Sequence, residues 1–191
     1  MTNTNKGKIT LDMKDEGNII ILLSNMVDLI DLIATNFSNK ARIYLIEHLV
    51  LSMRELSSFV EKYFDGKIDE DIKEKMEKMK TIRDAICHRS SDENWLKNNI
   101  KIQGALLFHH QVNDVEIQYG KTRIYLIRGI INLFSKFRKI FFDPSSIYII
   151  HRNPYSYKIE ETKLTESIEK LVNAIKHETL HLSKNVYSQR K

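Results

Sequence analysis

The sequence is poor in cysteine and in the residues that interrupt helices. Only two prolines and six glycines occur in 191 residues, and so few helix breakers favour long helices. The single cysteine, Cys87, cannot form an internal disulfide, so nothing in the sequence calls for an oxidising compartment. A chain of this length fits one domain with a sizeable core.

The sequence also lacks a long, uninterrupted apolar run. The most apolar stretch, residues 18–37, is interrupted by Asn25, Asp28 and Asp31, whereas a membrane-spanning helix needs about 20 predominantly apolar residues. Residues 1–17 are polar and mixed in charge, unlike a signal peptide or an anchor. We therefore expect a cytoplasmic protein with no membrane partner, in which residues 18–37 form a buried helix.

The apolar pattern predicts a helical bundle. Apolar residues recur at the helical period in five segments, which cover about 16–36, 39–64, 68–87, 121–141 and 160–187. No repeat or linker divides the chain, so we expect a single domain over residues 1–191. The expected fold class is all-α, with one inserted β-hairpin.

The hairpin is predicted over residues 99–119. Apolar and polar residues alternate at 100–102 and again at 115–119, which is typical of two paired strands. His109 and His110 lie in this segment, and alternation places adjacent side chains on opposite faces of a sheet. We therefore expect neutral, partly exposed histidines there and no shared metal.

The segment TIRDAICHRSSDENWL, residues 81–96, places an arginine and a histidine at the end of a predicted helix. On a helical wheel Arg83 falls inside the apolar stripe, and a buried arginine needs partners or a function. His88 lies in the last turn, where the helix dipole favours the protonated form, and Asp84 could orient either group. An arginine that holds a phosphate and a histidine that moves a proton suit phosphodiester chemistry. In the alternative interpretation Arg83 pairs with an acid of another helix and His88 caps a helix end.

The stretch IRDAICHRSS resembles the R-x4–6-H motif of the HEPN domain superfamily, in which an arginine, commonly followed by a polar residue, precedes a histidine. These positions are Arg83, Asp84 and His88. The apolar helices on either side look like the family's bundle, so the resemblance implies a HEPN-like domain. It also implies a metal-independent endoribonuclease. Arg83 would bind the scissile phosphate, and His88 would act as base or acid in attack by the 2′-OH, leaving a 2′,3′-cyclic phosphate. Asp84 would be a supporting residue.

The same resemblance implies partners. Many HEPN proteins are toxins or antiphage effectors that dimerise, with two motifs across the interface. The implied partners are therefore RNA, a second copy of the chain and an antitoxin protein, and no cofactor or metal is implied. Other members are inactive, which leaves a non-catalytic module that binds RNA, a nucleotide or a protein as the alternative. Ser90 stands where an adenylylation-regulated subgroup has a tyrosine, so such regulation is not expected.

A basic segment follows the hairpin. No acid occurs between Glu116 and Asp143, and the net charge of +5 permits a nucleic-acid partner without demanding one. Four cations of the predicted helix lie within about 80° of each other on the wheel, which predicts an RNA-binding surface made by Lys121, Arg128, Lys136 and Lys139. Tyr125 lies in the same sector and could stack on a base. A solvated helix face is the alternative.

Two other patterns suggest chemistry that we do not expect. Residues 177–181, HETLH, match the H-E-x-x-H spacing of zinc metalloproteases. Both His177 and His181 lie on the side of the predicted helix away from its apolar face, so we reject a zinc site. Cys87 lies beside the apolar stripe of its helix, which predicts a packed thiol and not a nucleophile.

Overall fold

The computed structural model describes residues 11–37, 41–64, 68–88, 107–111, 113–142 and 154–188, and side chains within them except at 88, 107, 154–159 and 180–188. Along these residues the elements, in chain order, are α1 Met13–Thr35, α2 Ala41–Phe64, α3 Glu70–His88, β1 Leu107–Gln111, β2 Asp114–Tyr119, β3 Thr122–Tyr125, the π-helix η2 Leu126–Ile131, α5 Asn132–Phe142 and α6 Pro154–Ser188.

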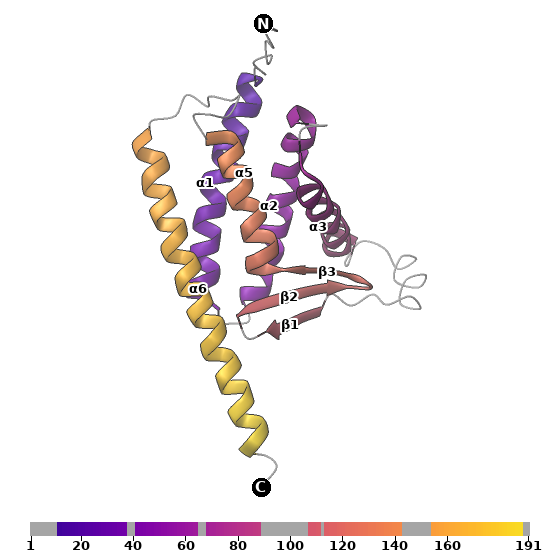
Figure 1. Ribbon diagram of the computed structural model, residues 1–191, viewed down its shortest axis with the longest axis vertical. Helices are drawn as coiled ribbons and strands as arrows, with labels where there is room; N and C mark the ends of the chain where they lie inside the picture. Colours follow the sequence, from indigo (N-terminus) through magenta and orange to yellow (C-terminus); the bar gives the residue numbers. More distant parts are fainter. Residues whose placement is uncertain are drawn as a thin grey trace, which may run out of the picture.

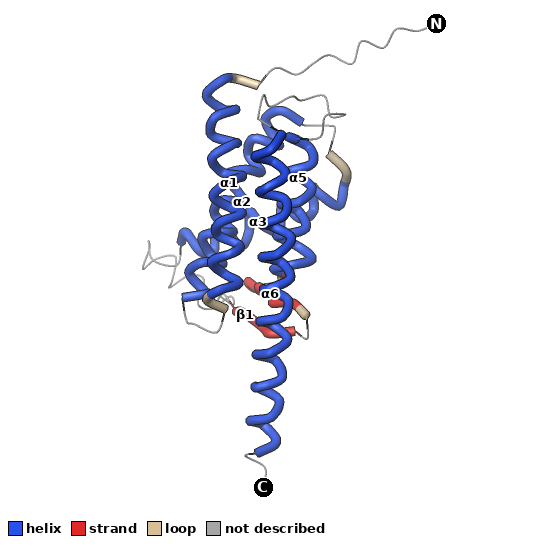
Figure 2. The backbone as a smooth tube through the Cα atoms, turned by 90° about the vertical axis from the view of Figure 1, so that its left-hand side faces the viewer, coloured by secondary structure: helices blue, strands red, loops and turns tan. Residues whose placement is uncertain are grey.

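Four helices form the body of the molecule. Figures 1 and 2 show α1, α2, α5 and α6 running side by side along the long axis, while α3 lies obliquely across α2. The helices pack because their apolar residues recur every three or four positions, as at Ile19, Leu23, Met26, Ile30 and Ile33 of α1, all of which are buried. Full burial of each such side chain contributes about 2 kcal/mol.

Short polar contacts fix where helices begin. The Asp12 carboxylate accepts a hydrogen bond from the Lys14 backbone N–H at 2.8 Å and caps α1. The Asp69 carboxylate accepts from the Ile72 N–H at 2.8 Å, three residues on, and so starts α3.

A small antiparallel sheet lies beneath α5 and α3 in Figure 1, beside the lower part of α6. The strand order is β1-β2-β3, and Ile117 lies opposite both Phe108 and Ile124. These side chains face the core, where Ile117 and Ile124 are buried. The turn between β2 and β3 contains Gly120 at φ 57°, a left-handed conformation that glycine adopts without strain.

The predicted all-α bundle with a hairpin is confirmed in its coarse form, and the part that needs correction is residues 121–141. This segment was expected to be one helix, but it begins as β3 and passes through η2 before α5. The run from Ile124 to Ile131 is apolar on nearly every side, so periodicity alone did not separate a strand from a helix. The inserted unit is therefore a three-stranded sheet. The strand expected at 100–102 lies outside the described residues.

The other predicted helices lie close to those observed. The first three have ends within three residues of α1, α2 and α3, whereas α6 begins at Pro154, six residues before its predicted start. These helices were predictable because the apolar pattern is local. The capping residues Asp12 and Asp69 fix the starts of α1 and α3.

Helix α1 needs a further correction. At 23 residues it is long and apolar enough to cross a membrane by length and composition alone, so the expectation that this segment is too short and too polar was wrong. Core helices of soluble proteins pass the same test. In this structure α1 packs against α2 and α6, and 44% of its most apolar window is buried. Its buried residues belong to the packed core, and the cytoplasmic location stays a prediction.

Candidate functional site

Arg83 and Asp84 form an ion pair near the C-terminal end of α3. The Arg83 Nη1 lies 3.0 Å from Asp84 Oδ1, and the two side chains are 35% and 44% exposed. The prediction of a buried arginine is therefore wrong, because this guanidinium is partly open to solvent. Among the described residues the observed partner of Arg83 is its chain neighbour, so the alternative pairing with an acid of another helix stays a prediction.

The path of the buried stripe along α3 explains this exposure. The buried residues Met76, Met79, Ile82 and Ala85 are spaced by three, and each such step turns the stripe by about 60° around the helix. By Ala85 the buried direction has moved away from Arg83. A wheel that assumes one fixed apolar face therefore placed Arg83 too deep.

His88 is the last residue of α3, and its side chain lies outside the described part of the structure. The helix backbone places its Cα about 7.5 Å further along the axis than that of Arg83, and about 140° around it. Arg83 and Asp84 are thus brought together by the structure, whereas the convergence of His88 on Arg83 stays a prediction.

Cys87 is exposed, which corrects the expectation of a packed thiol. The same turning of the stripe accounts for it, because Ala85 rather than Cys87 is buried in this last turn.

The four basic candidates do not share one helix face. Lys121 lies in the turn between β2 and β3, Arg128 lies in η2, and Lys136 and Lys139 lie in α5. The prediction of one surface assumed one continuous helix, and that assumption is wrong; contact of these four residues with RNA stays a prediction. Lys121 and Lys139 are exposed, whereas the Lys136 Nζ binds the Asp71 carboxylate of α3 at 2.7 Å.

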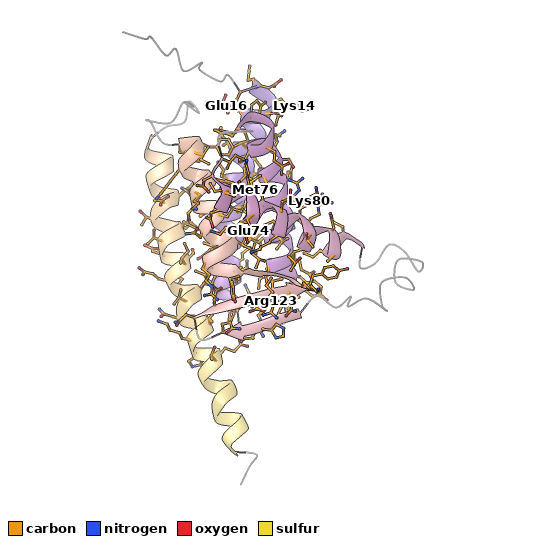
Figure 3. The ribbon with its side chains drawn as sticks, turned by 45° about the vertical axis from the view of Figure 1, so that its right-hand side comes forward. Lys14, Glu16, Glu74, Met76, Lys80 and Arg123 are labelled. Carbon is orange, nitrogen blue, oxygen red and sulfur yellow. The ribbon has the colours of Figure 1, made fainter. Side chains whose placement is uncertain are left out.

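Two buried carboxylates of the sheet lie close to two exposed arginines, one in β3 and one in η2. Arg128 Nε lies 3.7 Å from the buried Asp114 carboxylate, and Arg123 Nε lies 3.6 Å from the buried Glu116 carboxylate. Figure 3 labels Arg123 on the sheet. The Arg128 guanidinium also lies 3.5 Å from the centroid of the Tyr125 ring. A base that stacked on this ring face would therefore have to displace an arginine.

Asp114 has a second role at this point. Its carboxylate accepts hydrogen bonds from the backbone N–H groups of Ile127, at 2.8 Å, and Arg128, at 3.1 Å. It therefore caps the start of η2 from the neighbouring strand, satisfying donors that would otherwise have no partner within the helix.

A cluster that the sequence did not predict joins Arg42, His110 and Glu178. The Arg42 guanidinium binds the Glu178 carboxylate, donates to the Phe37 carbonyl at 2.6 Å, and lies 3.2 Å from His110 Nε2. The His110 ring meets the Phe37 ring edge to face at 5.7 Å. The inward position of His110 in the strand alternation was the available signal, and its two charged partners come from distant parts of the chain.

The HETLH segment takes part in this cluster through its glutamate. Glu178 faces Arg42 and His110, and His177 is exposed. Among the residues that the structure describes, no group of three His, Cys, Asp or Glu side chains could hold a metal ion.

Among the described residues, the arginine that the fold buries is Arg138. Its side chain is 1% exposed between α5 and α6, with Nη2 3.2 Å from Glu161 Oε2 and the guanidinium 5.8 Å from the Phe134 ring centroid. The next residue, Lys139, is exposed. In a segment this basic, the sequence did not indicate that Arg138 belongs to the core.

Compared with protein-family models, with curated proteins and with solved structures, the chain matches none.

Proposed function

We propose that this protein is a metal-independent endoribonuclease of HEPN type, in which Arg83 and His88 carry the reaction and Asp84 supports them. The observation that carries the proposal is the half-exposed Arg83–Asp84 ion pair near the end of α3, five residues before a histidine. The mostly helical bundle around this helix is compatible with the proposal.

The ion pair suits Arg83 for phosphate binding. An ion pair this exposed contributes about 0–1 kcal/mol, so a phosphodiester can displace Asp84 from the guanidinium at little loss. Arginine binds phosphate oxygens through paired N–H donors, and these interactions strengthen as charge develops in the transition state. Asp84 would hold the guanidinium in place before the RNA binds.

His88 would move the proton. A histidine titrates near neutral pH, so it can accept the 2′-OH proton as that oxygen attacks the adjacent phosphorus. The bond from phosphorus to the 5′ oxygen then breaks, and this oxygen takes a proton from the protonated His88 or from water. The products are a 2′,3′-cyclic phosphate on one fragment and a 5′-OH on the other. No metal or cofactor enters this reaction.

A second copy of the chain fits the same proposal. Because the Cα atoms of Arg83 and His88 lie about 140° apart around α3, an arginine and a histidine from two copies could face one phosphate more directly than two from one helix. The exposed Lys121 and Lys139 would contact the RNA backbone. Lys136 would do so only on leaving Asp71, and Arg128 only alongside Asp114. Cytoplasmic location and an antitoxin partner belong to this proposal.

One observation favours a second candidate, a non-catalytic module that binds RNA, a nucleotide or a protein. The Arg83 guanidinium is already held by Asp84 within the chain. In that case Arg83 would form a structural ion pair near the end of α3 and would not bind a substrate.

An assay of RNA cleavage in excess EDTA distinguishes the ribonuclease from the non-catalytic module. We expect fragments from the wild type, and loss of cleavage in Arg83→Ala and in His88→Ala. Lys80→Ala is the matched control, because Lys80 is an exposed cation of the same helix (Figure 3). This variant should cleave RNA like the wild type. Circular dichroism and size-exclusion chromatography would verify equal folding and assembly. Equal residual cleavage in both variants would identify a contaminant, and binding without cleavage would favour the second candidate.

A further inference from the structure

Four elements meet at the Arg42 cluster. Phe37 follows α1, Arg42 lies in the first turn of α2, His110 lies on β1 and Glu178 lies on α6. The three polar side chains are largely shielded, at 22%, 16% and 22% exposure for Arg42, His110 and Glu178. None of them belongs to the proposed ribonuclease site.

The arginine determines which ring nitrogen of His110 carries the proton. A guanidinium only donates hydrogen bonds, so the nitrogen 3.2 Å from Arg42 Nη2, which is Nε2, must accept. In the neutral ring the proton then lies on Nδ1. That atom is 3.9 Å from Glu178 Oε2, and both atoms are buried without a hydrogen-bond partner among the described residues. A small approach of the two would satisfy both atoms.

We propose that Arg42, His110 and Glu178 form a pH-sensitive latch that fastens β1 and α6 to the start of α2 while His110 is neutral, and that releases them when His110 is protonated. Protonation turns Nε2 from an acceptor into a donor and places two cations 3.2 Å apart. The Arg42–His110 bond is then lost, and the histidine and the arginine compete for the one carboxylate of Glu178.

The groups around His110 decide the direction of its titration. Burial lowers the His110 pKa from its ordinary value of 6.5, the nearby Glu178 raises it, and Arg42 lowers it, with a net decrease. Val115, opposite on β2, is uncharged, and Phe37 is the α1-side neighbour. The folded state thus favours neutral His110, and acidification opposes the latch.

The latch is positioned to control how α6 is held. A neighbouring bond, from Thr179 Oγ1 to the Gln111 carbonyl at 3.3 Å, joins the same strand to the same helix. Beyond this level α6 continues past the sheet, as Figures 1 and 2 show. Release at His110 would loosen the docking of β1 against α6 while leaving the contacts of α6 with α1 in place.

The first test is the histidine itself. Long-range 1H–15N spectra of the full-length protein report the tautomer and the titration of each imidazole, and His110→Gln assigns the signal. We expect the Nδ1–H tautomer above pH 7 and a midpoint below 6.5. An Nε2–H tautomer, or a midpoint above that value, overturns the proposal.

The second test is the urea midpoint of unfolding at about pH 7.5 and about pH 5. We expect the wild type to lose stability on acidification, and His110→Gln to lose clearly less. His109→Gln is the control, because His109 is exposed on the opposite face of the same strand and should behave like the wild type. An equal loss in the wild type and in His110→Gln overturns the latch.

Discussion

Arg138 shows at the scale of one residue how a cation is kept in a core. Its stem and guanidinium fill space beside Phe134, and its charge reaches Glu161, whose side chain is 47% exposed. Because Glu161 has solvent access, removal of the arginine would not leave this carboxylate buried and uncompensated. The lost packing should therefore dominate the effect of a substitution.

We predict that Arg138→Ala lowers the free energy of unfolding by about 3 kcal/mol, through the cavity that it leaves. Arg138→Met keeps most of the volume and should cost less than half as much. Urea unfolding of both variants measures the difference. Equal losses would show that the charge, rather than the packing, stabilises this position.

Asp114 is a second residue whose role can be tested alone. It caps η2 through the N–H groups of Ile127 and Arg128, so Asp114→Ala leaves these donors without that acceptor. We predict a loss of about 1–3 kcal/mol in unfolding free energy. Asp114→Asn keeps an acceptor oxygen and should lose less. Arg128→Ala removes only a partly exposed ion pair and should stay within about 1 kcal/mol; a larger loss there would assign the effect to the charge pair.

At the scale of elements, the packing of β3 against η2 depends on a glycine. A Cβ built on Gly129 would lie 2.8 Å from Cγ1 of Ile124, a buried residue of β3. Gly17 in α1 has nothing within 4 Å of the same atom. An alanine at Gly17 therefore tests helix propensity alone, whereas an alanine at Gly129 also tests steric fit.

We predict opposite effects of alanine at these two sites. Gly17→Ala should stabilise the protein by about 0.5–1 kcal/mol, because alanine favours a helix and restricts the unfolded chain. Gly129→Ala should destabilise it by about 1–3 kcal/mol, because the clash exceeds that gain. Thermal unfolding of both variants is the measurement, and a stabilised Gly129→Ala would show that β3 can move away from η2.

At the scale of the whole molecule, several aspartates tie one helix to another. Asp71 on α3 binds Lys136 on α5 and Lys75 of its own helix, which lowers the Asp71 pKa to about 2. Asp31 on α1 accepts from Ser167 on α6, and Asp15 on α1 accepts from Lys62 on α2; both contacts hold these pKa values below the ordinary 3.8.

These shifts predict acid sensitivity. Since the folded pKa of Asp71 is lower than its unfolded value of 3.8, the unfolded chain binds protons first, and the contribution of this group is lost as pH falls from 3.8 to about 2. We expect the urea midpoint to fall over this range, and Asp71→Asn to reduce the fall. Glu77→Gln, at an exposed acid of the same helix, should leave it unchanged. An identical fall in Asp71→Asn would show that the contacts of Asp71 do not contribute to this acid sensitivity.

Local features of this protein could be predicted from the sequence, whereas contacts between distant residues could not. The helices α1, α2 and α3 were predictable because an apolar stripe is a local pattern. The exposure of Arg83 was not, because the stripe of α3 turns around the helix. The bonds from Arg42 to Glu178 and from Lys136 to Asp71 join residues 136 and 65 positions apart, and no local pattern reports such partners.

The chemistry of the cleaved ends tests the proposed ribonuclease activity most sharply. Purified wild-type protein would be incubated in EDTA with an RNA and with a DNA of the same sequence. We expect cleavage of the RNA alone, with 2′,3′-cyclic phosphate and 5′-OH ends, and no cleavage by His88→Ala. Cleavage of the DNA, or RNA fragments that carry 5′-phosphates, would contradict attack by the 2′-OH and with it the proposed role of Arg83 and His88.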